Sequence, residues 1–288
     1  MKSIPFKIPK TEKDSFLLQV DYVPHFYDKL HQHPEAQLTL IHKSEGTLIA
    51  GDYIGNFYPD DMYVIGSNLP HVFKNEEHYY ENEEPQAYST TVFFDINSFG
   101  RDFLNLPETA NIRSFIAGLN NCYKVEDTTH KLMKQKMIEI FQLEGFDRLI
   151  KFLEILNLLS KSTEIKKLSN FITSRDYDAP EGKRMNDVLS FTFKESHRNI
   201  TIREVAQIAN MTSEAFCRYF KMRTRKTYMN FLNEIRVSNA SKLLINKDLT
   251  IANISANSGF TNLSNFNRFF KKVTGLTPTA YLIKLKSK

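Results

Sequence analysis

The sequence predicts an α+β protein in two parts: a small β-barrel followed by helices, then an all-α domain in the C-terminal third. Three observations predict it. Short β-rich segments separated by turns extend to about residue 94, helical periodicity follows from residue 107, and a helical motif is duplicated near the C-terminus. With 41% apolar and 25% charged residues among 288, the composition is globular and excludes extended disorder.

Composition also indicates where the protein works. Its two cysteines, Cys122 and Cys217, are too few for a disulfide framework or a four-thiolate zinc site, and they suit a reducing compartment. The N-terminal segment MKSIPFKIPK has no apolar core of signal-peptide length, and no apolar run reaches the ~18 residues needed to cross a bilayer. We therefore expect a cytoplasmic protein with no membrane partner.

Charge is distributed unevenly along the chain. Residues 184–288 contain 18 lysines and arginines against 6 acidic residues, a net charge of +12, whereas residues 1–183 have a net charge of −7. A basic third joined to an acidic two-thirds indicates a polyanion-binding module attached to another domain.

The β-rich part contains three alternating segments, at 36–42, 47–50 and 62–65, with turn residues at 44–46, 50–52 and 59–61. Regular short strands of this kind favour a sandwich or a barrel. The longest helical stretch, 129–167, carries an apolar stripe that Gly145 interrupts, which predicts two helices or one bent helix.

The basic third contains an internal repeat with an offset of 50 residues. Each copy has a short helical segment, then a tight turn with a residue that tolerates a left-handed backbone (Asn210 or Gly259), then a second helix. Thr201 and Glu204 form a capping box at the start of the first copy. This order predicts two helix-turn-helix units. The identical pairs are Phe216/Phe266, Arg218/Arg268, Phe220/Phe270, Lys221/Lys271, Thr224/Thr274, Thr227/Thr277 and Leu232/Leu282.

A polar stripe lies opposite the phenylalanines on each second helix. Arginine, asparagine and glutamate side chains can pair with base edges in the major groove, and lysine suits phosphate. On one isolated helix such a stripe would indicate only a solvated face, but duplication inside a +12 segment favours DNA. The predicted DNA-binding residues are Thr212, Ser213, Glu214, Cys217, Arg218, Lys221, Asn262, Leu263, Ser264, Asn267, Arg268 and Lys271.

Segments 251–260, 264–272 and 274–281, the last with the pattern Gly-x-Thr-Pro-x-x-Tyr, resemble the AraC/XylS family of bacterial transcription regulators. Arg225 and Ser255 depart from the family pattern, which usually has glycine and alanine there. The resemblance implies two helix-turn-helix units joined by a long helix, about 228–246, which read successive major-groove faces of double-stranded DNA. On that helix we expect core residues at Phe231, Leu232, Ile235, Leu243 and Leu244.

Segments 31–35, 57–65 and 68–71 resemble the sensing domain of cupin-type members of this family. Cupin metal sites use a His-x-His pair, a carboxylate and a later histidine. His31, His33 and His71 occupy the matching places, but Gln37 stands where the glutamate is expected. We therefore expect no metal or other cofactor, and a polar effector in a pocket formed by His31, His33, Glu35, Gln37 and His71. The alternative is a metal bound by the three histidines.

Together these features predict a transcription regulator, not an enzyme: an activator that responds to a small-molecule effector. We expect a cupin-like sensing and dimerisation domain at 1–165, a linker at 166–184 and a DNA-binding domain at 185–288. A homodimer is expected, and RNA polymerase is a further candidate partner. The alternative is a metal-dependent cupin enzyme fused to a DNA-binding module. No phosphate-binding Gly-x-x-x-x-Gly-Lys loop and no Gly-x-Ser-x-Gly elbow is present.

Overall fold

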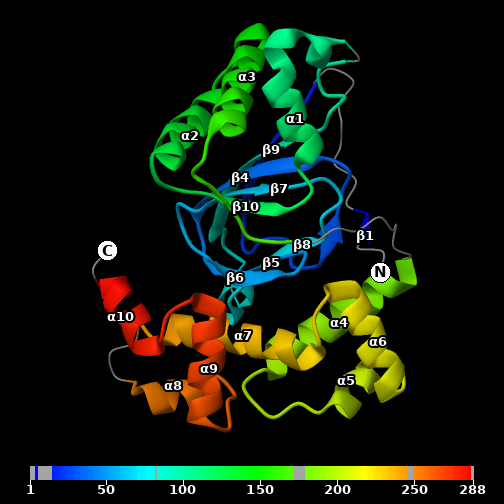
Figure 1. Ribbon diagram of the computed structural model, residues 1–288, viewed down its shortest axis with the longest axis vertical. Coiled ribbons are helices and arrows are strands. Elements are labelled where there is room, and N and C mark those ends of the chain that lie inside the picture. The colour runs from blue at the N-terminus through cyan, green and yellow to red at the C-terminus, as the bar shows by residue number, and fades with distance from the viewer. Residues whose placement is uncertain are drawn as a thin grey trace. The chain divides into compact units, whose positions relative to one another are not determined.

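The computed structural model describes residues 4–5, 15–81, 83–100, 102–170, 179–245 and 249–286 (Figure 1). The chain divides into two compact units between residues 176 and 177. The strands and helices α1–α3 belong to the N-terminal unit, and helices α4–α10 belong to the C-terminal unit. A sheet-containing N-terminal part and a helical C-terminal part agree with the predicted mixed fold.

The N-terminal unit contains two sheets. One has the strand order β11-β10-β7-β4-β9-β2, the other β1-β3-β8-β5-β6, and every pairing is antiparallel apart from β1 with β3. Strands β4, β5 and β7 confirm the three alternating segments predicted from the sequence. The bounds are β1 Ile4–Pro5, β2 Leu17–Val23, β3 His31–Gln32, β4 Ala36–Lys43, β5 Gly46–Ala50, β6 Tyr53–Phe57, β7 Met62–Ile65, β8 His71–Asn75, β9 Ala87–Phe94, β10 Cys122–Val125 and β11 Ile165–Lys167.

Three helices cover one face of the six-stranded sheet: α1 (Ala110–Gly118), α2 (Asp127–Ile140) and α3 (Gly145–Lys161) (Figure 1). Gly145 has a φ of +54°, in the left-handed region, so the predicted interruption separates two helices. Phe152 and Ile155 of α3 are fully buried against the sheet.

Alternation along β4 gives its two faces different roles. Leu38 and Leu40 are fully buried under the helices, whereas Ile41 packs between the two sheets with Gln37 and Thr39 on the same side. Successive side chains of a strand point to opposite faces, so a polar-apolar alternation places the polar wall of a pocket inside the unit.

The C-terminal unit contains the two predicted helix-turn-helix units, with α7 between them (Figure 1). The first consists of α5 and α6, and the second of α8 and α9. The bounds are α4 Ala179–Glu195, α5 Ile202–Ile208, α6 Ser213–Thr224, α7 Tyr228–Leu243, α8 Ile251–Asn257, α9 Leu263–Thr274 and α10 Pro278–Lys286.

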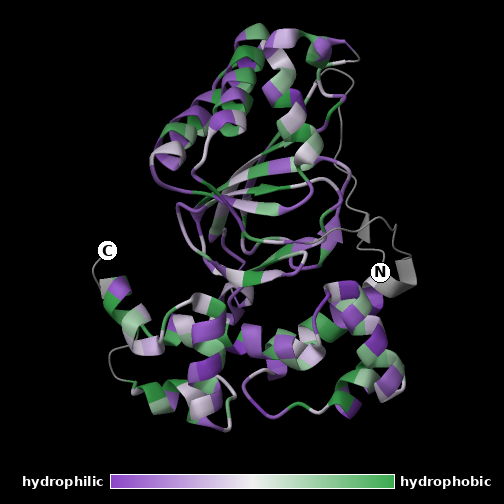
Figure 2. Ribbon diagram, viewed as in Figure 1, coloured by the Kyte–Doolittle hydropathy of each residue, from purple (hydrophilic) through white to green (hydrophobic). Residues whose placement is uncertain are grey.

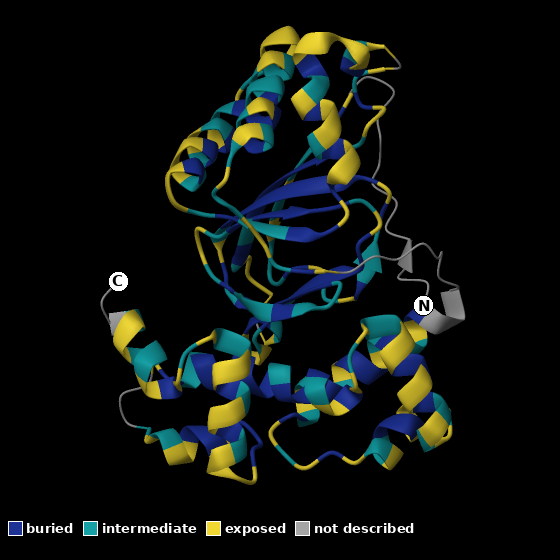
Figure 3. Ribbon diagram, viewed as in Figure 1, coloured by how far each residue is buried: buried dark blue, intermediate teal, exposed yellow. Residues whose placement is uncertain are grey.

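The local signals that predicted these helices are present in the structure. Thr201 and Glu204 form the expected capping box. Asn210 and Gly259 have positive φ angles of 54° and 87° in the two turns. The four repeated phenylalanines are fully buried, so the apolar spacing of four residues places them in the core: Phe216, Phe220, Phe266 and Phe270. Figure 3 shows that α6 and α9 each carry both buried and exposed residues.

The helix α7 is shorter than predicted, because it ends at Leu243, and position 246 lies outside the described residues. Its expected core residues Phe231, Leu232, Ile235 and Leu244 are buried, and Leu243 is partly buried. Figure 2 shows apolar and polar residues alternating around the helices of this unit.

The predicted linker at 166–184 includes the end of β11, which pairs with β10, and the first residues of α4. Residues 171–178 lie outside the part of the chain that the structure describes. Among the described residues, no helix is both long enough and apolar enough to cross a membrane.

Candidate nucleic-acid interface and internal pocket

The predicted DNA-binding residues lie on α6 and α9 and at the turns that precede them. The residues of the first polar stripe (Glu214, Cys217, Arg218 and Lys221) are exposed, and so are those of the second: Ser264, Asn267, Arg268 and Lys271. The fully buried phenylalanines of the same helices point to the opposite side. Burial therefore orients each helix with its polar stripe toward solvent.

The first residue of each stripe region is a helix cap. Thr212 Oγ1 accepts from the backbone nitrogen of Ala215 at 3.3 Å, and Asn262 Oδ1 accepts from that of Asn265 at 3.0 Å. Such caps satisfy backbone donors that the helix itself leaves unpaired. Ser213, the first residue of α6 after the Thr212 cap, is half-buried. Leu263, the first residue of α9, is 45% exposed.

The Arg268 side chain lies along its own helix. One terminal nitrogen donates to Asn265 Oδ1 at 2.8 Å, and the guanidinium carbon lies 4.9 Å from the centroid of the Phe269 ring. The side chain is nevertheless exposed. A base contact by Arg268 would exchange the Asn265 bond for two bonds to a guanine edge.

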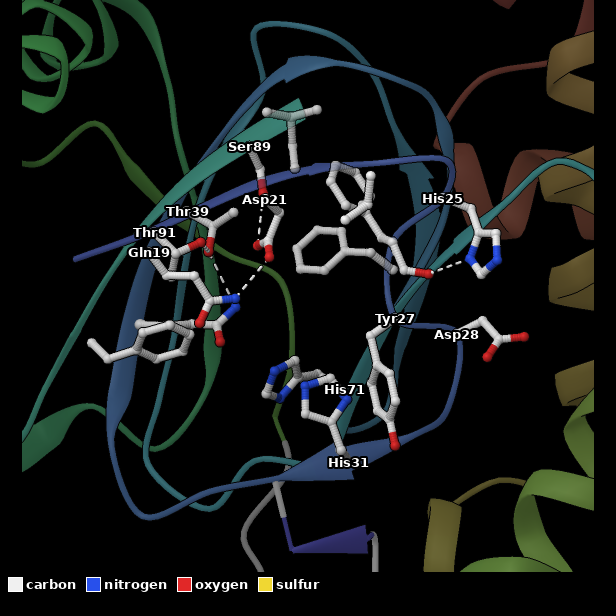
Figure 4. Close-up of a pocket in the computed structure, with 16 residues that line it drawn as sticks. Gln19, Asp21, His25, Tyr27, Asp28, His31, Thr39, His71, Ser89 and Thr91 are labelled. Atoms are coloured by element: carbon white, nitrogen blue, oxygen red, sulfur yellow. Dashed lines mark hydrogen bonds between the residues drawn. The ribbon is translucent and has the colours of Figure 1, made fainter. Parts of the chain in front are cut away.

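A cavity of about 400 Å³ lies inside the N-terminal unit (Figure 4). This volume is typical of small-molecule sites. Its polar wall comes from alternating positions of β2, β4 and β9, and three phenylalanine rings supply apolar surface. The lining residues are Gln19, Asp21, Val23, His25, Phe26, Tyr27, Asp28, His31, Gln37, Thr39, Ile41, His71, Phe73, Ser89, Thr91 and Phe93.

Three of the five predicted pocket residues, His31, Gln37 and His71, line this cavity. The other two, His33 and Glu35, are buried beside it. The His33 ring lies 5.1 Å from the His71 ring, centroid to centroid, and its Nδ1 is 3.8 Å from a Glu35 carboxylate oxygen.

The sequence did not indicate the wall formed by Gln19, Asp21, Ser89 and Thr91. Asp21 Oδ1 accepts from Gln19 Nε2 at 2.8 Å, and Asp21 Oδ2 accepts from Ser89 Oγ at 3.3 Å. Antiparallel pairing of β2 with β9 sets Asp21 opposite Ser89. Segment 18–22, Leu-Gln-Val-Asp-Tyr, does alternate in the sequence, and this signal could have placed Gln19 and Asp21 on one face of a strand.

The three histidines form one cluster. A ring nitrogen of each of His31, His33 and His71 lies within 4.8 Å of the others. Burial lowers the pKa of all three imidazoles, that of His31 to about 4, so they are neutral at pH 7. Each Nδ1 faces a backbone carbonyl oxygen: that of Lys29 for His31 (2.9 Å), of Glu35 for His33 (2.8 Å) and of Leu69 for His71 (2.7 Å).

These three residues fit a divalent cation by the chemistry of their donor atoms. Neutral imidazole nitrogen suits zinc, copper and nickel, and a histidine that binds a metal usually donates its other ring N–H to a carbonyl or carboxylate. Gln37 Oε1 lies 3.0 Å from His33 Nε2, and Gln37 is the residue for which the sequence resemblance implied a carboxylate. An amide oxygen brings no charge to such a site.

Comparison with known proteins supports the assignment of the C-terminal unit. A family model described as a helix-turn-helix domain matches residues 205–283. The HTH-type transcriptional regulators YobQ and YdeC of Bacillus subtilis (strain 168), both named as uncharacterized, are 25% and 22% identical. The matches cover 68% and 88% of this chain and 86% of each relative. The HTH-type transcriptional activator RhaS of Mannheimia succiniciproducens is 22% identical over 86% of this chain and 87% of its own.

Residues 205–283 therefore form a helix-turn-helix domain of the AraC type, and the relatives are named as HTH-type transcriptional regulators. This match agrees with the DNA-binding role that the predicted family resemblance implied. Among solved structures, ToxT from Vibrio cholerae O395 aligns with 93% of this regulator and 97% of its own chain, at 15% identity and a TM-score of 0.36. The DNA-binding domain of AdpA in complex with a target DNA covers 35% of the regulator, at 23% identity and a TM-score of 0.33.

Proposed function

We propose that this regulator activates transcription in response to a small-molecule effector bound in a cupin-like N-terminal unit. In this proposal α6 and α9 read successive major-groove segments through the twelve residues predicted from the sequence. The N-terminal unit is also the dimerisation unit, and RNA polymerase is contacted at the promoter. The domain limits remain those proposed above: 1–165, 166–184 and 185–288.

One observation carries the DNA-reading part of the proposal: α6 and α9 expose equivalent polar stripes within a segment of net charge +12. Arg218 and Arg268 occupy the same position in each copy. A guanidinium can bond the O6 and N7 atoms of guanine together, and exposed Lys221 and Lys271 lie one turn further, where phosphate contacts are expected.

The cavity supports the sensing part of the proposal. It is enclosed largely by side chains of β2, β4 and β9, with a polar wall, aromatic rings and buried histidines. A pocket with a few fixed polar groups on an apolar lining is typical of small-molecule recognition. Ligand binding there would favour one arrangement of the regulator over another by its difference in affinity for the two.

A homodimer is supported by apolar residues exposed on α3. Phe146 is 73% exposed and Ile150 is 42% exposed, and they lie four residues apart on one helical face. Large apolar side chains exposed together on one helix are typical of association surfaces.

The alternative function, a metal-dependent cupin enzyme fused to a DNA-binding module, is favoured only by the histidine cluster. The relatives of this chain, by contrast, are named as transcriptional regulators or activators. Elemental analysis of protein purified without chelators, combined with His33→Ala and His71→Ala, tests it. An enzyme requires a stoichiometric ion that the variants lose, and absence of any ion would contradict the enzyme hypothesis.

Titration of full-length protein against its operator duplex tests the proposed function. We expect the double variant Arg218→Ala/Arg268→Ala to lose at least ~30-fold in affinity, because each arginine reads a base pair worth ~1–3 kcal/mol. Lys284→Ala, which removes a positive charge on α10, is the matched control and should lose much less. Equal losses for both variants would contradict reading through α6 and α9.

A further inference from the structure

We infer that the internal pocket selects a positively charged ligand and rejects carboxylates and phosphates of the same size. This inference rests on the proposed function of the pocket as the effector site. It follows from which lone pairs and charges the lining presents, because recognition of a small ligand in a partly dehydrated cavity depends on matching donors to acceptors.

The protonation of the three imidazoles is determined by their backbone partners. A carbonyl oxygen only accepts hydrogen bonds, so the Nδ1 atoms of His31, His33 and His71 each carry the proton and donate. For His71, whose ring is 1% exposed and whose Nδ1 proton is taken up by the Leu69 carbonyl oxygen, this leaves Nε2 as a buried acceptor. On the histidine side, the pocket therefore presents an acceptor at His71.

His71 contributes a lone pair that the described protein does not satisfy. The residue is 1% exposed, its Nε2 is buried, and no hydrogen-bond partner for that atom is present among the described residues. His71 lines the cavity, and Figure 4 shows its ring beside that of His31. A buried acceptor left unpaired costs ~1–3 kcal/mol, so a ligand that donates to it recovers that free energy.

Gln37 adds a further acceptor. Its Nε2 donates to Thr39 Oγ1 at 3.2 Å, which turns Oε1 toward His33 Nε2 at 3.0 Å. The Gln37 amide oxygen is held there as an acceptor, so this side of the wall offers a carbonyl oxygen and no further N–H donor.

Fixed charge favours the same class of ligand. No lysine or arginine is among the described residues that line the cavity, whereas Asp21 and Asp28 are. Asp28 is paired with Lys74 at 3.1 Å, but Asp21 is held by the neutral side chains of Gln19 and Ser89. The Asp21 carboxylate points into the cavity across from the histidines in Figure 4, so an anionic ligand would meet a like charge.

Two kinds of ligand share the required chemistry, a positive centre that accepts lone pairs. A divalent transition-metal ion would use the ring nitrogens of the three histidines. A protonated amine would donate to His71 Nε2 and to Asp21, with its carbon skeleton against Phe26, Phe73 and Phe93. Binding of a metal ion would depend most on the histidines, whereas binding of an amine would depend most on Asp21.

The experiment measures ligand-induced stabilisation and direct binding by calorimetry with metal-depleted full-length protein. The probes are ZnCl2, NiCl2, and a panel of small primary amines and diamines, each paired with the carboxylate of the same carbon skeleton. We expect at least one metal or amine to raise the melting temperature of the N-terminal unit, and each carboxylate to have a smaller effect than its amine. A carboxylate that stabilises more than its amine partner, or no stabilisation by any metal or amine, would overturn the inference.

Two variants separate the sources. A metal ligand predicts that His71→Gln weakens binding at least tenfold while Asp21→Asn has little effect. An amine predicts at least a tenfold loss for Asp21→Asn, with Asp102→Asn, an exposed aspartate away from the cavity, as the matched control. If Asp21→Asn folds and neither variant changes the binding of a stabilising cation, that cation binds elsewhere and the inference is wrong.

Measuring operator affinity with and without the bound probe distinguishes failure of the inferred ligand class from failure of the proposed sensing function. If a carboxylate occupies the pocket and changes operator affinity, the sensing function stands and only the ligand class is wrong. If a cation occupies the pocket but operator affinity and transcription in vitro do not change, the ligand class stands and the sensing function is wrong.

Discussion

Arg268 and Lys271 lie one turn apart on the exposed side of α9, and the structure gives them different surroundings. Arg268 is hydrogen-bonded to Asn265 and stacked near Phe269, which holds its planar guanidinium close to the helix. Lys271 lies in the last turn of α9. Once the Asn265 bond is exchanged, the planar guanidinium can present two donors to one base edge, whereas a lysine at the end of the helix acts as a point charge on phosphate.

We therefore expect Arg268→Ala to lose ~1–3 kcal/mol of operator binding and to relax preference at one base pair. Lys271→Ala should weaken binding to all sequences alike and reduce the salt slope by about one unit. Phe270→Ala should instead cost ~3–5 kcal/mol of folding stability, because that ring is fully buried. Titration of each folded variant against single-base variants of the operator checks these outcomes. Full base preference in Arg268→Ala would show that α9 is oriented differently.

Arg225 and Gly275 close α6 and α9 with the same left-handed turn, although only one is glycine. Their φ angles are +59° and +77°, and each backbone N–H bonds the carbonyl four residues earlier. The family departure at Arg225 is therefore a strained cap, since a side chain in this region costs ~1–2 kcal/mol that glycine avoids.

Because glycine also loses more entropy on folding, Arg225→Gly should gain only ~0.5–1 kcal/mol of stability. Gly275→Ala should lose ~1 kcal/mol for the converse reason. Chemical denaturation monitored in the C-terminal unit measures both. A loss of stability on Arg225→Gly would mean that the arginine side chain contributes more than its backbone strain costs.

At the scale of elements, the helix α7, the segment between α4 and α5, and the second turn meet at one junction. Arg236 of α7 is 6% exposed; its Nε donates to the carbonyl oxygen of Ser196 at 2.8 Å and its Nη2 to that of Arg198 at 2.6 Å. Its guanidinium carbon lies 5.8 Å from the centroid of the Phe260 ring in the second turn. The junction connects the entry to the first helix-turn-helix unit with the turn of the second.

Gly259 is required at the same junction. A Cβ at this position would lie 2.2 Å from the Ser196 carbonyl oxygen, and its φ of +87° already disfavours any side chain. The close approach of backbone to backbone explains why glycine, rather than asparagine as at position 210, occupies the second turn.

Replacing Arg236 with methionine should therefore destabilise the C-terminal unit by about 2–4 kcal/mol, because two carbonyl groups in a buried site lose their donor. Gly259→Ala should destabilise it by at least ~2 kcal/mol through the clash. Arg203→Met, on the exposed side of α5, is the control and should change stability by less than ~0.5 kcal/mol. Denaturant titrations of the full-length variants measure the difference. A stable Arg236→Met would contradict a structural role for the junction.

Local patterns were enough to predict the elements that depend on neighbouring residues. The offset of 50 residues, the Thr201–Glu204 capping box and the interruption at Gly145 are short-range signals, and the structure confirms them. The pocket wall was missed because Asp21 is positioned by pairing with Ser89, 68 residues away. Arg236 likewise depends on carbonyls 38 and 40 residues earlier. Pairing across such distances leaves no mark on local periodicity.

At the scale of the whole molecule, the proposed dimer concerns the outer face of α3. Phe146→Asp should shift the protein from dimer to monomer, because a buried charge without a partner would replace an apolar contact. Leu106→Asp changes a residue that is 48% exposed outside α3 and should leave the dimer intact. Sedimentation equilibrium over a range of concentrations measures both. A monomeric wild type, or a dimer that tolerates Phe146→Asp, would contradict association through this face.

The central claim is that both helix-turn-helix units read DNA at the same time. Selection of binding sites from random duplexes with the full-length protein, followed by titration at 50–200 mM salt, tests it most directly. We predict two base-specific blocks about one helical turn apart, 10–10.5 base pairs between centres, and a steep fall in affinity with salt. A single block with no change on Arg218→Ala, or no duplex affinity even at low salt, would contradict the claim.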